Sequence, residues 1–354
     1  TSCLASFGAG VTGPDLEAHL RTRGYTLGHF PQSFEHSTLG GWVAARSSGQ
    51  QSLHYGRIED LFTGGTVETP QGTLTLPSFP ASAAGPDLRH LVLGSEGRMG
   101  IISSTTVRIT PLPQQEVFRT VFFKRLPLSM LRLSTATETE TTLRLAGHPQ
   151  AVTALERLLA TRGAGEQKCM LVFGATGSHT RVRQALRAAS TVIRRYSGVQ
   201  IAGQYLGAQW RHSRFRTPYL RNTLWEIGYA IDTMETAVTW DRVPAALEAI
   251  ERAITTAASA QNAAVHVFTH VSHVYRHGAS LYTTLVFRVL PDPDAMLSLW
   301  GDLKRAGSAA IVQHGGTISH QHGVGIDHAP YLQEEKGALG LRTLRAVFRQ
   351  FDPK

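Results

Sequence analysis

Cysteine is nearly absent from this chain. Only Cys3 and Cys169 occur among 354 residues, which excludes a disulfide framework and favours a reducing, cytoplasmic setting. Long apolar runs are also missing: nothing approaches 18 consecutive apolar residues, so no transmembrane helix is expected. The opening residues lack the basic head and apolar core of a signal peptide.

Lysine is the second scarcity. The chain has a net charge of +9, yet only five of its 35 basic residues are lysines. Arginine suits bidentate binding of phosphate or carboxylate, although a G- and C-rich genome gives the same bias without function. The most basic run, Thr180–Arg195, is predicted as a helix with Val182, Leu186 and Val192–Ile193 inward. Aromatic residues do not interleave its arginines, so nucleic acid is not an expected partner.

Hydrophobic patterning divides the chain near Pro113. Before this point the sequence is rich in glycine, with a predicted helix at Gly13–Gly24 and a predicted strand at Thr105–Thr110. Ile58–Leu61 is predicted as a strand that leads into a hairpin turn within Glu68–Leu74. The run Pro111–Pro113 closes the strand and marks a domain boundary.

After Pro113, strands alternate with long helices. The apolar spacing predicts helices at 149–163, 180–195, 241–258 and 293–309, and strands at 119–123, 168–175, 265–271 and 280–289. Asp241 is predicted as the N-cap of its helix. This order predicts an α+β fold in which helices cover an antiparallel sheet.

Two glycine-rich stretches have the composition of ligand-binding loops. In Phe30–Gln50 a Ser/Thr cluster precedes Gly40 and Gly41, which lets backbone N–H groups approach a ligand closely, although such a pair more often reflects plain chain geometry. In Leu93–Ser103 a glycine recurs every third residue before a predicted strand. No helix follows that stretch, so a Rossmann dinucleotide site is not indicated.

The stretch "SHQHGVG" contains the residues most suited to chemistry. His320 and His322 flank Gln321, and an extended backbone would place both imidazoles on one face, as proton donors or phosphate ligands. No cysteine, HExxH or suitably spaced carboxylate completes a tetrahedral ligand set, so no metal site is predicted. A tight loop with surface histidines is the alternative.

Six stretches in order resemble one family. "SFEHSTLGGWVAARSSG", "YGRIEDL", "GPDLRHLVLGSEGRMGII", "WDRV", "HVSHVYRHGASLY" and "ISHQHGVG" are similar to flavoproteins of the vanillyl-alcohol-oxidase type, and within them to the alkyldihydroxyacetonephosphate (alkylglycerone-phosphate) synthases. The resemblance implies a partial two-part FAD-binding domain plus a cap domain. It assigns 1–113 to the second part of the FAD-binding domain, 114–310 to the cap and substrate domain, and 311–354 to a segment returning to the flavin site.

The resemblance also implies an activity in ether-lipid synthesis. Such an enzyme uses FAD without net redox change: the flavin N5 attacks acyl-dihydroxyacetone phosphate, a fatty acid departs, and a long-chain alcohol replaces it. The expected partners are these lipid substrates, with at most peripheral membrane contact, because no strongly amphipathic, aromatic-rich helix stands out. A homodimer is compatible with the resemblance.

Site residues follow by matching motifs. The resemblance assigns Tyr282, His320, Gln321 and His322 to catalysis, and Arg221 and Arg132 to the substrate phosphate and the flavin surroundings. The residues that it assigns to FAD are Ser37, Thr38, Gly40, Gly41, Ser47, Ser48, Glu96, Gly97, Gly100, Ile101 and Ile102.

Two departures keep alternatives open. Gln321 replaces the family's middle histidine, and a glutamine cannot transfer a proton at neutral pH. The pyrophosphate loop of the family is expected before Thr1, on a longer form of this protein or on a separate polypeptide. The alternatives are therefore an FAD-linked oxidase or dehydrogenase of a 2-hydroxy acid, and a non-catalytic fragment that completes another chain.

Overall fold

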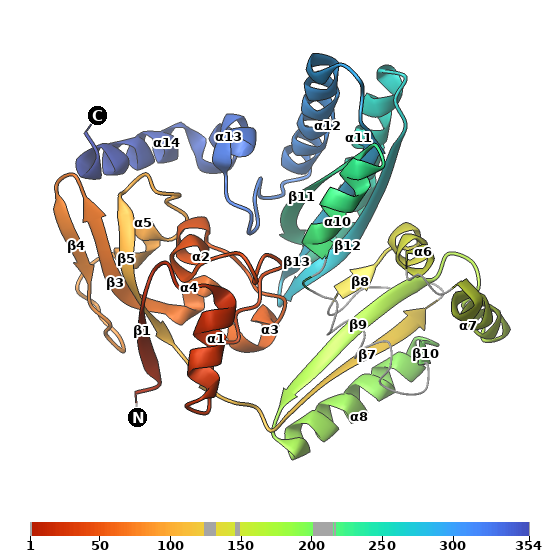
Figure 1. The fold of residues 1–354 in the computed structure, drawn as a ribbon, viewed down its shortest axis with the longest axis horizontal. Helices are drawn as coiled ribbons and strands as arrows, with labels where there is room; N and C mark the ends of the chain where they lie inside the picture. Colours follow the sequence, from red (N-terminus) through yellow and green to blue (C-terminus); the bar gives the residue numbers. More distant parts are fainter. Residues whose placement is uncertain (1, 124–131, 146–148, 201–214, 216, 354) are drawn as a thin grey trace. The chain divides into compact units, whose positions relative to one another are not determined.

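The computed structural model describes the chain except residues 1, 124–131, 146–148, 201–214, 216 and 354 (Figure 1). Two compact units emerge: unit 1 comprises Thr1–Leu112 and Thr317–Lys354, and unit 2 comprises Pro113–Gly316. Both units combine helices with antiparallel sheets, so the predicted α+β class is confirmed.

Unit 1 is built on a four-stranded antiparallel sheet. Its strand order is β1-β5-β3-β4, with β1 at Leu4–Gly8, β5 at Ile101–Arg108, β3 at Phe62–Thr69 and β4 at Gly72–Leu76. The predicted hairpin turn joins β3 to β4. A two-stranded sheet pairs β2 (Tyr25–Thr26) with β6 (Thr110–Pro111).

Unit 1 also contains several short helices and one long C-terminal helix. They are α1 (Gly13–Arg21), α2 (Leu39–Ala45), α3 (Ser52–Tyr55), α4 (Ile58–Leu61), α5 (Arg89–Val92), α13 (Gly325–His328), η2 (Ala329–Tyr331) and α14 (Leu332–Phe351). Thr12 caps α1, whose Leu16 and Leu20 are buried as predicted. The predicted strand at Ile58–Leu61 is wrong. The Asp60 carboxylate accepts a hydrogen bond from the Arg57 N–H and so closes a single helical turn there.

Unit 2 is built on a seven-stranded antiparallel sheet. Its strand order is β10-β7-β9-β8-β12-β13-β11. The bounds are β7 Gln115–Phe123, β8 Arg132–Ser134, β9 Cys169–Gly177, β10 Val199–Gln200, β11 Tyr229–Thr239, β12 Val265–Tyr275 and β13 Gly278–Arg288. The two runs predicted as adjacent strands form the β12–β13 hairpin.

The helices of unit 2 are α6 (Ala136–Arg144), α7 (Pro149–Thr161), α8 (His179–Arg195), α10 (Thr217–Glu226), η1 (Trp240–Arg242), α11 (Val243–Ala260) and α12 (Pro293–Gln313). Four helices of unit 2, α7, α8, α11 and α12, lie close to the predicted ranges, whereas α6, α10 and η1 were not predicted. On α8 the basic residues face solvent while Ile193 packs on Val121 and Phe173. Val192, predicted to face inward, is instead 51% exposed.

Asp241 does not cap α11. It lies inside the 3-10 turn η1, where its carboxylate bonds the Thr239 side chain. The helix starts two residues later, with Pro244 in its first turn. Proline needs no N–H partner in a first helical turn and fixes φ there, so it decides where this helix begins.

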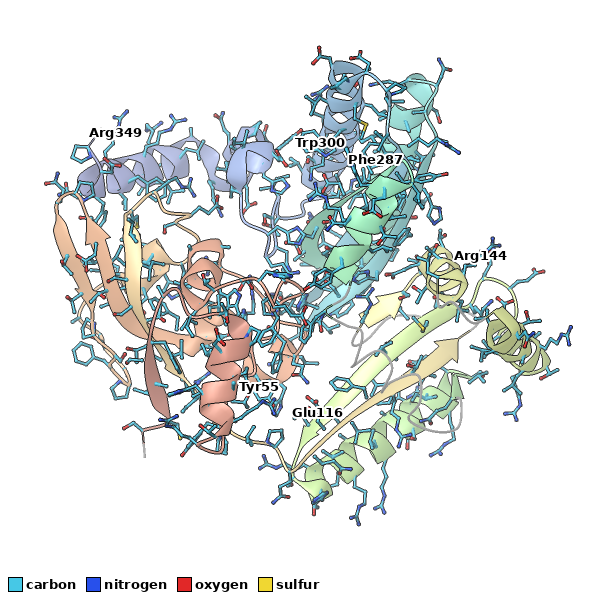
Figure 2. All side chains as sticks on the ribbon, viewed as in Figure 1. Tyr55, Glu116, Arg144, Phe287, Trp300 and Arg349 are labelled. Carbon is cyan, nitrogen blue, oxygen red and sulfur yellow. The ribbon has the colours of Figure 1, made fainter. Side chains whose placement is uncertain are left out.

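Helices α11 and α12 cover one face of strands β11 and β13 (Figure 1). On that face Asp232 accepts a hydrogen bond from Trp300, whose indole stands on α12 (Figure 2). Gly307 of α12 sits directly against Met234, and Phe287 of β13 is buried. Because side chains alternate along a strand, the residues between these point to the opposite face.

Candidate functional site

A row of polar residues crosses the opposite face of the unit 2 sheet. Ser134 pairs with His270, His270 with Tyr282, and Tyr282 with Glu235. Residues that are directly opposite in antiparallel strands project to the same side. Four strands therefore place a hydroxyl, an imidazole, a phenol and a carboxylate side by side.

The imidazole and the phenol of this row are stacked. The ring centroids of His270 and Tyr282 lie 5.0 Å apart with an interplanar angle of 21°. Burial raises the pKa of Tyr282 to about 12, and the Glu235 carboxylate acts in the same direction, while a hydrogen bond with Thr233 opposes them. The phenol therefore keeps its proton at neutral pH.

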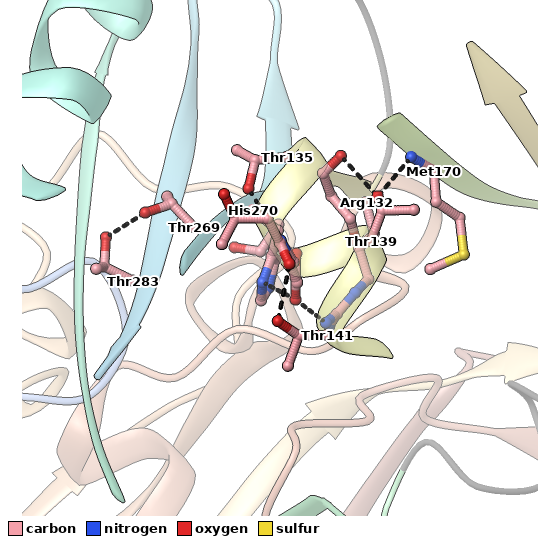
Figure 3. A network of polar contacts seen from close by, with 12 residues as sticks. Arg132, Thr135, Thr139, Thr141, Met170, Thr269, His270 and Thr283 are labelled. Carbon is pink, nitrogen blue, oxygen red and sulfur yellow. Dashed lines mark hydrogen bonds and ion pairs between the residues drawn. The ribbon is translucent and has the colours of Figure 1, made fainter. Parts of the chain in front are cut away.

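A buried carboxylate joins this row from α6. Glu138 Oε1 lies 2.8 Å from Arg132 Nη2 and 2.9 Å from His270 Nδ1. Figure 3 labels these two partners, Arg132 and His270. Burial alone would raise the pKa of Glu138, but the contacts with His270 and Arg132 outweigh burial and lower the pKa to about 2. The group is an ionised carboxylate, and Arg132 is its counter-ion.

The pKa of His270 is lowered. Burial is the main cause and the Arg132 charge adds to it, whereas Glu138 and Glu235 act in the opposite direction. The ring is therefore neutral at physiological pH.

Arg221, the other predicted substrate arginine, is exposed on α10.

A β-bulge borders the row. Ser272 and His273 together face Ser280, because the pairing register shifts between Val271 and Val274. Ser280 Oγ lies 2.6 Å from Ser272 Oγ and accepts a hydrogen bond from the His273 N–H at 2.9 Å. The bulge thus ties down the strand directly beside Tyr282. Among the described residues, no group of three His, Cys, Asp or Glu side chains is placed to hold a metal ion.

In unit 1 the first predicted cofactor stretch forms the start of α2. Thr38 caps this helix through the Gly41 N–H, and Ser37 Oγ accepts a hydrogen bond from the Trp42 indole. Gly40 therefore lies in a helical turn and not in a loop. Its lack of a side chain is required, because a Cβ there would come within 2.6 Å of Ala9 Cβ.

The next two serines differ in their partners. Ser47 Oγ lies 2.8 Å from Nε2 of the buried His29, whose ring contacts Trp42. Ser48 is also buried, yet its hydroxyl has no hydrogen-bond partner among the described residues. Buried hydroxyls are normally paired, so an orphaned one here fits a site that receives a polar ligand.

Glu96, which is predicted to lie at the flavin, bonds the backbone of the histidine segment (residues 317–325). It adopts a left-handed backbone conformation, and its two carboxylate oxygens accept hydrogen bonds from the N–H groups of Val324 and Gly325, at 2.5 and 2.9 Å. Ile101, another residue predicted to bind FAD, is 75% exposed. A Cβ at Gly100 would meet the Glu68 carbonyl oxygen at 2.2 Å, which explains the glycine.

The histidine segment is not extended. Its backbone bends at residues 320–322, so the period-two argument for a shared face is wrong: His320 is 6% exposed whereas His322 is exposed. Charged groups hold the segment. Arg57 donates a hydrogen bond to the His320 carbonyl at 2.8 Å, and Glu335 accepts one from the Ile318 N–H at 2.9 Å.

Two residues of these clusters have no recognisable signal in the sequence: Glu138 and Glu235 are almost fully buried, yet no motif assigns either a role. The pattern Thr135-x-x-Glu138 does signal a helix start, and Thr135 is indeed the N-cap of α6. Nothing in that pattern indicates a glutamate that turns away from the cap toward Arg132 and His270.

Comparison with known proteins identifies the family. Residues 114–354 match the profile of the family described as FAD linked oxidases, C-terminal domain. The chain belongs to this family. Residues 2–76 match a second profile, described as an FAD binding domain, and FAD is the cofactor that both profiles name.

Relatives extend over the whole chain. The alkyldihydroxyacetonephosphate synthase of Dictyostelium discoideum is 28% identical and covers 100% of this chain and 61% of its own length. The synthase of Trypanosoma brucei brucei is 27% identical, and the match covers 100% of this chain and 60% of the synthase. The expected resemblance to these synthases is thus confirmed. The chain spans about three fifths of the length of these relatives.

Solved structures agree on the fold. A structure of alkyldihydroxyacetonephosphate synthase superposes with a TM-score of 0.79 at 25% identity, covering 99% of this chain and 64% of the other. The 4-ethylphenol oxidase from Gulosibacter chungangensis superposes with a TM-score of 0.71 at 11% identity, over 99% of this chain and 75% of the other. At that identity the likeness concerns the fold alone.

Proposed function

We propose that this FAD-linked protein exchanges the acyl group of acyl-dihydroxyacetone phosphate for a long-chain alcohol. The observation that carries the proposal is the placement of Tyr282, in a motif similar to that of the synthases, beside His270 and near Arg132. The full-length match to alkyldihydroxyacetonephosphate synthases supports the substrate class. Phosphate recognition is assigned to arginine, whose guanidinium matches a phosphate in shape and charge.

FAD supplies the nucleophilic N5 nitrogen in this reaction, with no net redox change. We assign its binding to Ser37, Thr38, Gly40, Gly41, Ser47, Ser48, Gly97, Gly100, Ile101 and Ile102. The orphaned hydroxyl of Ser48 and the closely approached backbone at Gly40 fit this assignment. Glu96 is better assigned to the histidine segment, because both of its oxygens already accept backbone hydrogen bonds there.

We assign Tyr282 the role of proton donor. With a pKa of about 12 the phenol holds its proton over the physiological range and can give it to a substrate oxygen. We also assign His320 and His322, which belong to unit 1, to acid–base chemistry. Gln321 can orient a polar group by hydrogen bonds but transfers no proton. Arg132 and Arg221 are assigned to the substrate.

The test begins with the visible spectrum of the purified chain with and without added FAD. Flavin bands that survive desalting establish a formed cofactor site. The flavin-loaded chain is then given acyl-dihydroxyacetone phosphate and a radiolabelled long-chain alcohol, and label is measured in the ether product. Exchange that requires both substrates supports the proposal. A flavin-loaded chain that incorporates no label contradicts it.

A second candidate is oxidation of a 2-hydroxy acid. It is favoured by the mitochondrial D-lactate dehydrogenase (cytochrome) of Arabidopsis thaliana, which is 23% identical over 90% of this chain and 55% of its own length. The same preparation is mixed anaerobically with D-lactate and other 2-hydroxy acids. Bleaching of the flavin band would favour this candidate, because the exchange reaction leaves the flavin oxidised at its end. A chain that retains no flavin points to the non-catalytic alternative.

A further inference from the structure

One carboxylate oxygen of Glu138 contacts both Arg132 and His270. This Oε1 atom is 2.8 Å from Nη2 of Arg132, on β8, and 2.9 Å from Nδ1 of His270, on β12. The carboxylate side chain is only 5% exposed. It stands on the first turn of α6, so that helix carries a negative charge to the row of polar residues on the sheet.

The contact decides which nitrogen of His270 holds the proton. His270 Nδ1 has no hydrogen-bond partner in the described part of the chain, so its contact with Glu138 acts through electrostatics. A lone pair on Nδ1 would face an ionised oxygen at 2.9 Å, which is repulsive, whereas an N–H dipole there is attracted. The neutral ring is therefore the Nδ1–H tautomer, and Nε2 carries the lone pair.

Other polar and charged groups also surround the His270 ring. Arg132 from β8, Tyr282 from β13 and Glu235 from β11 all face His270, and Glu251 from α11 acts on Glu138. Of the carboxylates, Glu138 is the one at ion-pair distance from the ring among the described residues. The ring in turn stacks on Tyr282. A change at Glu138 thus reaches the phenol through His270.

We propose that Glu138 is a positioning residue: one carboxylate oxygen keeps His270 in the Nδ1–H tautomer under Tyr282 and holds the Arg132 guanidinium beside them. Glu138 itself touches no substrate. The proposal rests on the proposed function in so far as Tyr282 and Arg132 serve the exchange reaction. The state of His270 can be measured whatever reaction the protein catalyses.

The first experiment is nuclear magnetic resonance of the full chain with ¹⁵N-labelled histidine. The signals of His270 are assigned by their loss in His270→Gln. Nitrogen shifts of the wild type should report protonated Nδ1 and unprotonated Nε2. In the near-isosteric Glu138→Gln this preference should weaken, and the pKa of His270 should fall further because an attractive charge is gone. Glu140→Gln is the matched control, since Glu140 is exposed on the same helix.

Arg132→Gln gives the opposite expectation. Removing a positive charge should raise the pKa of His270 while Glu138 keeps the proton on Nδ1. A purely structural role for Glu138 predicts no such opposed pair of shifts. If Glu138→Gln does not fold, Arg132→Gln still decides: a raised pKa with Nδ1 protonated supports the proposal, and an unchanged pKa overturns it.

The second experiment is kinetic and uses the flavin-loaded chain. The kcat of alkyl exchange should fall at least about tenfold in Glu138→Gln and stay within about twofold in Glu140→Gln, a contrast that follows from misplacement of catalytic groups. An unchanged His270 tautomer and pKa in Glu138→Gln overturn the proposal. A changed tautomer in a chain that never exchanges alkyl groups supports the positioning role and overturns the proposed function instead.

Discussion

Glu138 is a carboxylate with almost no access to solvent, so its ionisation links the fold to pH. Its pKa is about 2 in the folded chain and 4.5 without the fold. A lowered carboxyl pKa contributes stability that is complete above the unfolded value and is lost as the pH falls through the folded value. The contribution is on the order of 3 kcal/mol, from about 1.4 kcal/mol per pKa unit.

We therefore expect Glu138→Gln to lose the most stability at neutral pH. The difference in free energy of unfolding between wild type and variant should be constant from pH 7 to about pH 5 and should shrink below pH 4.5. Urea unfolding at pH 6 and pH 3 measures it. A difference that stays equal at both values would show that Glu138 is not an ionised partner of Arg132 and His270.

Tyr282 offers the residue-scale test of chemistry. Tyr282→Phe removes the hydroxyl but keeps the ring that stacks on His270, so the fold and flavin content should be unchanged. The exchange rate should fall about 10²–10⁴-fold, the usual contribution of a positioned proton donor. Tyr229→Phe, on the outer strand β11, is the control. Equal rates in Tyr282→Phe and wild type would remove Tyr282 from the mechanism.

Sequence reasoning reached part of this residue-scale description. Tyr282 and Arg132 were assigned from their motifs, and the structure brings both to His270. Glu138 was out of reach because the local pattern describes a capping box, whose glutamate bonds its own helix start. In the fold, the Thr135 N–H bonds the Thr269 carbonyl instead, which frees Glu138 for tertiary partners. Long-range pairing of this kind has no local sequence signal.

At the scale of elements, apolar spacing located the helices α7, α8, α11 and α12 and the β12–β13 hairpin, because each has an apolar face that packs in the core. It failed where tertiary contacts set the backbone. The segment 317–325 contains alternating residues that suit a strand, yet Arg57, Glu96 and Glu335 bond its backbone groups one by one. Those three residues are far away in sequence from one another, so the bent conformation could not be foreseen.

The role of Glu96 can be tested on this segment. Glu96→Ala removes both acceptors of the Val324 and Gly325 N–H groups, each worth about 1.5–3 kcal/mol as a charged hydrogen bond. Backbone amides of 317–325 should exchange with deuterium at least about tenfold faster. Glu334→Ala, at an exposed position of α14, is the control. Unchanged exchange in Glu96→Ala would contradict the assignment to this segment.

Two glycines of α12 provide a matched pair for packing. A Cβ at Gly307 would lie 2.3 Å from Met234 Sδ, whereas one at Gly301 would meet only the end of the Arg305 side chain at 3.3 Å. Gly307→Ala should destabilise the chain by about 1–3 kcal/mol through overpacking. Gly301→Ala should be neutral or stabilise by up to about 1 kcal/mol, because alanine favours helix. Thermal unfolding measures both, and equal melting temperatures would refute this packing of α12.

At the scale of the whole molecule, charge and helix composition govern contact with membranes. No helix in the described part of the chain is long and apolar enough to cross a bilayer, while the net charge is +9. We expect a minor fraction to sediment with anionic vesicles at physiological salt, and less at higher salt as the attraction is screened. Sedimentation of most of the protein under physiological conditions would show that membrane contact is stronger than peripheral.

The division of the chain into two units is only partly visible in the sequence. The change of patterning near Pro113 predicts a domain boundary, and the two units, which divide between Leu112 and Pro113, each have a buried core. That the C-terminal residues from Thr317 belong with the N-terminal unit is a property of the folded chain. Periodicity describes only neighbours along the sequence, so it cannot assign a distant segment to a partner.

The row Ser134–His270–Tyr282–Glu235 makes the protein unequally tolerant of insertions and deletions. Extra residues in the turn between β12 and β13, or before α6, leave the pairing of these four side chains intact. Loss of one residue between His270 and the bulge, or between the turn and Tyr282, would shift one strand by a single step and turn its side chain to the helix-covered face. In a library of variants of this length, natural or engineered, changes in chain length should therefore collect in the turns and avoid the strands between them.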